Sequence, residues 1–187
     1  QPVLNLRNGS GFTAVAGGDV VVNAQVDGRG GAAGATSGAV DLSAGGSVRF
    51  NASVVTQIAD IRARAIAGSV VTAAGQGLYS LSSAGTPGGT IDLSAGGDLT
   101  TGIASTTGAL RLTSTGGAVT IGQGIDATVG AVTINAATDA NLDTDIVSLR
   151  SGASLLVTAG RDIQVRAQVD GRGGAATGGT AAFIAGR

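Results

Sequence analysis

The stretches that decide the fold are GAVDLSAGGSVRF (residues 38–50), GTIDLSAGGDLTT (89–101), GALRLTSTGGAVTI (108–121) and GASLLVTAGRDIQV (152–165). Each begins with a short run in which apolar and polar residues alternate. A corner of small residues and glycine follows, and then a second alternating run. Alternation with a period of two residues, bounded by glycine, is typical of half-buried β-strands. The chain is therefore predicted to repeat a strand–corner–strand unit.

The repeat spacing predicts a solenoid. Its corners fall at Ala16, Ala44, Ala95, Thr115 and Ala159, with weaker copies near Ala74 and Ala137 and a last one at Ala185, so successive steps are 28, 30, 21, 20, 22, 22 and 26 residues. Two or three short strands in each coil of this length indicate stacked coils that contact only their neighbours. We expect an all-β parallel β-helix of about seven coils, each of roughly 20–30 residues, with residues 1–187 forming one segment.

The core is predicted to be made of stacked aliphatic side chains, because 43% of residues are hydrophobic while only three Phe, one Tyr and no Trp are present. Similar aliphatic residues recur at the same position of each repeat, so that successive coils can stack them and fill a narrow core. The 34 glycines are expected to supply turns at positive φ. For the segment from Ile58 to Ile66 the sequence does not decide between a helical turn and an excursion from the coil. The residues expected to point inward are Val20, Val22, Val48, Phe50, Leu99, Val119, Ile121, Ile163 and Val165, with Asp19, Asp41, Asp92 and Asp162 outward.

Composition argues against several function classes. With no His, Cys, Glu or Lys, most general-base, nucleophile and metal-ligand roles have no candidate, so we expect no enzyme, cofactor or metal site. With a net charge of −1 the chain has no excess of positive charge with which to bind nucleic acid. No apolar run approaches the roughly 20 residues that a membrane span needs.

The candidate interaction loops are two copies of the decapeptide AQVDGRGGAA, at residues 24–33 and 167–176. They carry Asp27 and Arg29, and Asp170 and Arg172. Both fall inside lengthened steps, where extra residues must leave the coil. Because Asp-Gly readily forms a turn, we interpret the decapeptide as a structural turn rather than as a binding loop.

Two smaller charge clusters are weighed in the same way. Asp139, Asp143 and Asp145 form a local cluster of carboxylates, in which Asp143 and Asp145 could bind Ca²⁺ or act as a pair, but such aspartates are more often a solvated face or a turn. Arg62 and Arg64 form the one close basic pair, and we interpret it as a salt-bridged or solvated face.

The four stretches quoted above resemble filamentous-haemagglutinin-like exoproteins of Gram-negative bacteria, and the resemblance runs from about residue 11 to residue 187. It implies a right-handed parallel β-helix that is exported through an outer-membrane secretion partner and serves as an adhesin, a biofilm component or a toxin stalk. The Asn-Pro-rich motif of the family's secretion domain is absent, since the only prolines are Pro2 and Pro87. The resemblance therefore implies a shaft segment, secreted or displayed on the bacterial surface.

Two functional hypotheses follow. The first is a structural or adhesive shaft without catalysis, whose partners are surface glycans or proteins of host or bacterium. The alternative is a carbohydrate-binding or carbohydrate-cleaving β-helix module, which would need aromatic residues and clustered carboxylates. Since the sequence opens with a strand pattern at Val3–Leu6 and stops at a corner near Ala185, we also expect coils to continue, in a longer array or by end-to-end β-stacking of copies.

Overall fold

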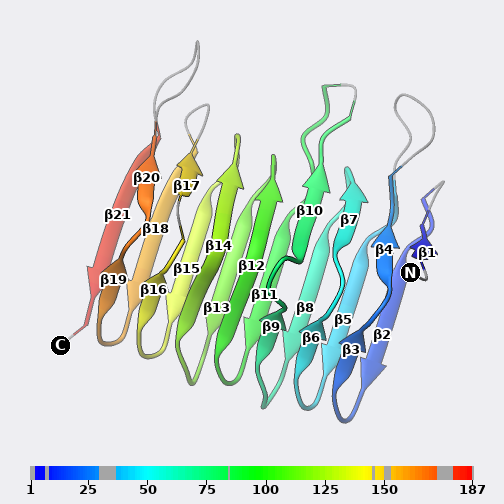
Figure 1. Ribbon diagram of the computed structural model, residues 1–187, viewed down its shortest axis with the longest axis horizontal. Helices are drawn as coiled ribbons and strands as arrows, with labels where there is room; N and C mark the ends of the chain where they lie inside the picture. Colours follow the sequence, from blue (N-terminus) through cyan, green and yellow to red (C-terminus); the bar gives the residue numbers. More distant parts are fainter. Residues whose placement is uncertain are drawn as a thin grey trace.

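The computed structural model describes residues 3–6, 9–29, 37–83, 85–144, 146–149, 153–171 and 179–186. Within them the chain forms a parallel β-solenoid of about seven turns and contains no helix (Figure 1). Every pair of named strands is parallel, because each strand lies beside the equivalent strand of the next coil. The predicted all-β parallel solenoid is confirmed.

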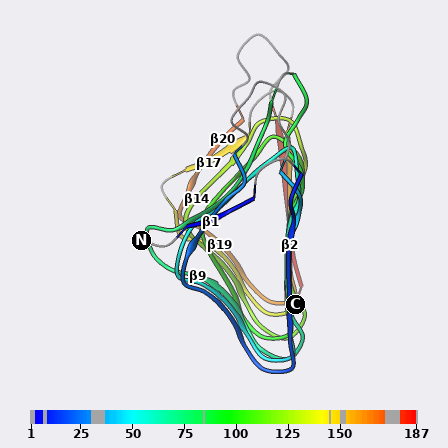
Figure 2. The same cartoon turned by 90° about the vertical axis from the view of Figure 1, so that its right-hand side faces the viewer.

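One side of the solenoid is an eight-stranded sheet, which we call the flat face because its strands follow one nearly straight side of the cross-section (Figure 2). Each of its strands starts a new coil. They are β2 (Phe12–Ala16), β5 (Val40–Ala44), β8 (Ile61–Ala65), β11 (Ile91–Ala95), β13 (Leu110–Ser114), β15 (Val132–Ala136), β18 (Ser154–Ala159) and β21 (Thr180–Ala185).

A thirteen-stranded sheet closes the tube by bending across the two remaining sides of the roughly triangular cross-section (Figure 2). In the middle coils a single long strand runs across both sides, whereas elsewhere two short strands do so. The strands are β1 (Val3–Asn5), β3 (Val20–Val22), β4 (Gln25–Asp27), β6 (Val48–Phe50), β7 (Val54–Gln57), β9 (Val70–Thr72), β10 (Gly77–Leu81), β12 (Leu99–Thr106), β14 (Val119–Ala127), β16 (Ala140–Leu142), β17 (Ile146–Leu149), β19 (Ile163–Val165) and β20 (Gln168–Asp170).

The core consists of apolar ladders that run along the axis. In β11, Ile91 and Leu93 are fully buried while Asp92 between them is partly exposed, so the two-residue period separates the inside from the outside. Of the residues predicted to point inward, six are buried and two, Val20 and Ile163, pack partly buried against the core. The ninth, Val165, stands in register with buried Leu142 but is 43% exposed, because no described coil covers it. The six buried residues are Val22, Val48, Phe50, Leu99, Val119 and Ile121.

The register of the flat face corrects one corner. Ala44 pairs with Ala65, and Ala65 pairs with Ala95, so the corner of that coil follows Ala65 and the marker predicted near Ala74 is wrong. The long 30-residue step therefore runs from Ala65 to Ala95. The segment that the sequence left open is settled as well, because Ile61–Ala65 is the regular strand β8.

The glycines of the corners are required by close packing between coils. A Cβ added at Gly45 would lie 2.1 Å from the carbonyl oxygen of Gly17, and one added at Gly96 would lie 2.2 Å from that of Ile66. Among described glycines, positive φ occurs only at Gly9, Gly75, Gly85 and Gly124, none of which is a corner glycine. Among the described glycines, the expected turns at positive φ are therefore found at these four positions and not at the corners.

Aspartates next to these glycines tie successive coils together. The Oδ1 atom of Asp19 accepts a hydrogen bond from the backbone N–H of Ser47 at 2.7 Å, and that of Asp98 accepts one from the N–H of Ala118 at 2.9 Å. Each carboxylate thus satisfies a backbone donor of the next coil, at a place where the strand ladder is interrupted.

The extra residues of the long coils lie, in sequence, at the opposite corner. The three longest steps contain the segments between β4 and β5, β10 and β11, and β20 and β21, all of which lead from the thirteen-stranded sheet to the flat face (Figure 1). The flat face itself is uninterrupted across its eight strands.

Candidate functional site

The outer surface of the flat face carries a row of alternating charges, which we call the charged rank: Asp41, Arg62, Asp92 and Arg111. These residues are in direct register on the adjacent strands β5, β8, β11 and β13. Their side chains point outward, because the residues on either side of each in its strand are buried. Thr13 and Thr133 extend the same row on β2 and β15.

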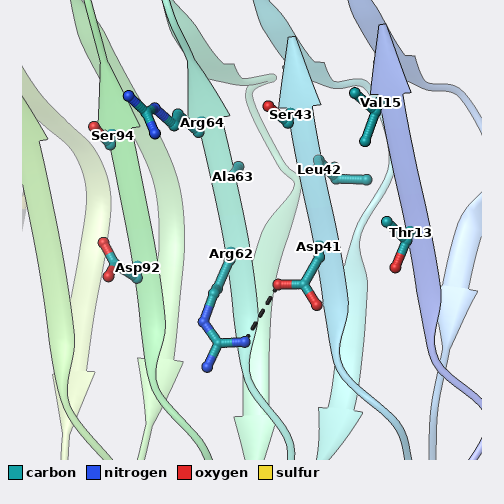
Figure 3. Close-up of a pocket in the computed structure, with 10 residues that line it drawn as sticks. All are labelled: Thr13, Val15, Asp41, Leu42, Ser43, Arg62, Ala63, Arg64, Asp92 and Ser94. Atoms are coloured by element: carbon teal, nitrogen blue, oxygen red, sulfur yellow. Dashed lines mark hydrogen bonds and ion pairs between the residues drawn. The ribbon is translucent and has the colours of Figure 1, made fainter.

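Ion pairs connect part of this rank. The Nη1 atom of Arg62 lies 3.3 Å from Oδ1 of Asp41 (Figure 3). The Nη2 atom of Arg62 also contacts Asp60, which lies just before β8. The hydrogen bond to Asp41 is the main cause that raises the pKa of Arg62 above its ordinary value. Arg62 remains about half exposed, so its charge is available at the surface.

A second outward row lies beside the charged rank and consists of Ser43, Arg64, Ser94 and Thr113. Arg64 is exposed, and its side chain extends toward the strand of Ser94 (Figure 3). Within the described part of the chain it forms no ion pair or hydrogen bond. A shallow hollow of about 320 Å³ lies over β2, β5, β8 and β11 between these rows.

The first copy of the repeated decapeptide folds back on itself. Arg29 donates from its backbone N and from Nε to Oδ1 of Asp27, at 3.0 and 2.9 Å, and from Nη2 to Oδ2 at 2.7 Å. Gly28 between them is buried, and a Cβ there would lie 2.7 Å from the Cβ of Ser37. The Asp-Gly-Arg sequence thus closes a local turn where the chain leaves the coil.

The second copy begins at the equivalent place, because β20 ends at Asp170 as β4 ends at Asp27. The chain returns at Gly179, whose N–H donates to the carbonyl oxygen of Gly171 at 2.8 Å. Arg172 lies outside the described residues. In each copy the Gln-Val-Asp residues form strand β4 or β20 and the Asp-Gly step follows at the end of that strand. The role of the two copies in binding stays a prediction.

Two of the three aspartates considered as a metal or catalytic cluster are paired with arginines. Asp139 pairs with Arg161, and Asp143 pairs with Arg166 of the next coil, while Asp145 lies outside the described residues. The hydrogen bond from Arg161 is the main cause that lowers the pKa of Asp139 below its ordinary value of 3.8. Among the described residues, no group of three or more aspartates is placed to hold a metal ion.

The charged rank is the feature that the sequence analysis missed. It identified Arg62 but not its neighbours in space, since it gave that segment no fixed register. A signal was present in the strand motifs Val-Asp-Leu, Ile-Arg-Ala, Ile-Asp-Leu and Leu-Arg-Leu, which start at residues 40, 61, 91 and 110. Their central residues alternate in charge from coil to coil.

Comparison of the chain with protein-family models, curated proteins and solved structures finds no match. The findings therefore show a β-solenoid and identify no family, so the resemblance to filamentous-haemagglutinin-like exoproteins stays an expectation. In the described residues there is no helix of the length and apolar character that a membrane-spanning helix requires.

Proposed function

We propose that this solenoid is a structural or adhesive shaft of a secreted or surface-displayed bacterial protein, as its resemblance to filamentous-haemagglutinin-like exoproteins implies. The observation that carries the proposal is the unbroken eight-strand parallel ladder of the flat face. Because each coil bonds to the coils before and after it, such a ladder extends along one axis and resists bending.

The use of charged residues supports a mechanical role. Asp19 and Asp98 bond to backbone donors of the next coil, and Arg161 and Arg166 pair with carboxylates of the preceding coil. These four side chains bind coil to coil. As a shaft, the protein would leave the cell through an outer-membrane secretion partner and would meet glycans or proteins of host or bacterial surfaces.

Immunogold labelling of intact cells of the native host, with an antibody against this segment, tests the proposal. We expect gold on the cell surface or on extracellular fibres, and loss of the signal after brief protease treatment of intact cells. Label confined to the cell interior would overturn the proposal. Cleavage of a polysaccharide by the purified protein would also overturn it, in favour of a carbohydrate-active module.

A further inference from the structure

The order of charges in the charged rank is self-complementary, which the ion pairs within one chain do not require. Counted across the strands from β5 to β13, it reads Asp41, Arg62, Asp92, Arg111. Read in the opposite direction, every position carries the opposite charge. A row with this property is complementary to a copy of itself turned end for end.

We propose that two copies of this chain pair through their flat faces, around a two-fold axis that runs parallel to the strands between β8 and β11. This inference does not depend on the proposed shaft role, because it uses only the outer surface of the flat face. The two solenoid axes are then antiparallel, and strand β8 of each copy faces strand β11 of the other.

The axis places opposite charges opposite one another along the whole rank. Arg62 faces Asp92 of the second copy, and Asp41 faces Arg111 of the second copy. Since the axis relates both copies, each contact occurs twice. A closed pair with self-complementary patches is the commonest form of homo-oligomer, and complementary potentials are what select a specific partner.

The second outward row fits the same axis. Arg64 faces Ser94 of the second copy, and Ser43 faces Thr113, so hydroxyl groups meet the one charge in this row. No like charges are brought together in either row. Arg64, which forms no ion pair or hydrogen bond within the described chain, gains the hydroxyl group of Ser94 of the second copy as a neighbour instead of a competing cation.

The shape of the face allows close approach. Its strands lie one behind another along a nearly straight side of the cross-section, so two such faces can meet over several strands (Figure 2). With this axis, the six strands from β2 to β15 of one copy lie over the same six strands of the other. At about 4.8 Å between strands and about 3.3 Å per residue, that overlap covers roughly 450–500 Å² on each partner.

This area sets the expected strength. Stable specific interfaces bury about 800 Å² per partner, so the pair should be weak and reversible. Exposed ion pairs are also screened by salt. We therefore expect a dimer that forms at high protein concentration and low salt and dissociates as salt is added.

Sedimentation of the purified chain and of two single variants tests the pairing. Asp41→Arg places an arginine opposite Arg111 of the second copy, and Arg111→Asp places an aspartate opposite Asp41. Each variant alone should dimerise roughly tenfold or more weakly than the unaltered chain, because like charges meet at two places. An equimolar mixture of the two variants restores every opposite-charge contact, so it should form heterodimers about as well as the unaltered chain dimerises.

Arg49→Asp is the matched control. It makes the same charge change as Arg111→Asp, but at an exposed residue of β6 in the thirteen-stranded sheet, so dimerisation should be unchanged. The proposal is overturned if the unaltered chain stays monomeric at about 1 mM in low salt, a concentration that would populate even a dimer with a Kd of about 1 mM. It is equally overturned if the mixed variants fail to pair, or if Arg49→Asp weakens the dimer as much as Arg111→Asp.

Discussion

At the scale of single residues, one buried hydroxyl group opposes the packing of the core. Thr101 in β12 is 2% exposed and points inward beside Ile121, and its Oγ1 has no hydrogen-bond partner. A buried polar group without a partner costs about 1–3 kcal/mol. Thr101→Val keeps the shape and removes the hydroxyl, so we expect the free energy of unfolding to rise by about 1 kcal/mol.

Urea denaturation measures this difference, and Thr100→Val is its control. Thr100 neighbours Thr101 on β12 but points outward and is partly exposed, so its replacement should change stability by less than about 0.5 kcal/mol. A clear loss of stability in Thr101→Val would mean that the hydroxyl bonds to a buried water.

A second residue-scale prediction concerns acid stability. Because the pKa of Asp139 is lower in the folded chain than its ordinary value of 3.8, the ionised form favours folding. This contribution is complete above the ordinary value and is lost as pH falls through the folded one. Asp139→Asn should therefore reduce the loss of stability on acidification below about pH 4.

Thermal unfolding of Asp139→Asn at a series of pH values checks this. Arg161→Gln should flatten the acid limb in the same way, because it removes the guanidinium that lowers the pKa. An acid limb that neither substitution alters would contradict the assignment.

At the scale of elements, each strand inside the ladder is held by the strands of two neighbouring coils. β14 pairs with β12 on one side and with β16 and β17 on the other, so a charge on its inner face disturbs three coils. Ile121→Asp buries an unpaired carboxylate at a fully buried position and should cost several kcal/mol. Thr120→Asp, which points outward on the same strand, should cost much less, as denaturant unfolding would show.

The prediction fails if both substitutions have the same small effect, since the inward and outward positions of β14 would then be equivalent.

Strand positions were predictable because inward and outward residues alternate, whereas the register between coils was not. The Ala-Gly pair at residue 74 looks like a corner, yet the corner in space follows Ala65 and contains a single glycine, Gly68. With the marker misplaced, Arg62 and Arg64 fell in a segment of uncertain structure. The charged rank depends on aligning four strands separated by steps of 21, 30 and 19 residues, so local pattern alone could not assemble it.

The repeated loops allow a prediction at the same scale. The contacts that Arg29 makes with Asp27 are local, so replacing both Asp27 and Arg29 with Ser should leave the unfolding free energy and any adhesion nearly unchanged. Parallel assays of stability and of binding to surface glycans or proteins test this. A large loss of adhesion at unaltered stability would make the loop a binding element.

At the scale of the whole molecule, the two ends of the ladder expose core positions. Phe183 in β21 is in register with fully buried Val157, so it points inward, yet it is 43% exposed. At the other end, Phe12 and Ala14 of β2 are in register with buried residues of β5 and are partly exposed. Each end therefore presents an apolar surface and a strand edge that a further coil would cover.

The two ends also complement each other in size. If β2 of a second copy lies beside β21 with Ala16 against Ala185, Phe12 meets Ala181 and Ala14 meets Phe183. Each phenylalanine thus meets an alanine. The outward side chains Val15 and Ile184, both well exposed, meet as an apolar cross-strand pair. β1 would at the same time lie beside β20. No strand of the second copy would pair with the free edge of β19, because β3 of that copy belongs to the coil of β2 and lies one coil further along the axis. This joint is therefore weaker than the boundary between two coils of one chain.

We therefore expect end-to-end association of the isolated segment, visible as rods of several lengths by negative-stain microscopy at high protein concentration. Phe183→Asp places a carboxylate in the centre of the joint and should abolish the rods. Leu156→Asp, on the outer side of β18, should leave them intact. Because the charged rank is untouched, Phe183→Asp should retain the lateral dimer, which separates the two modes of association. Rods of unchanged length in Phe183→Asp, or single particles from the unaltered chain under all conditions, would show that the ends do not join.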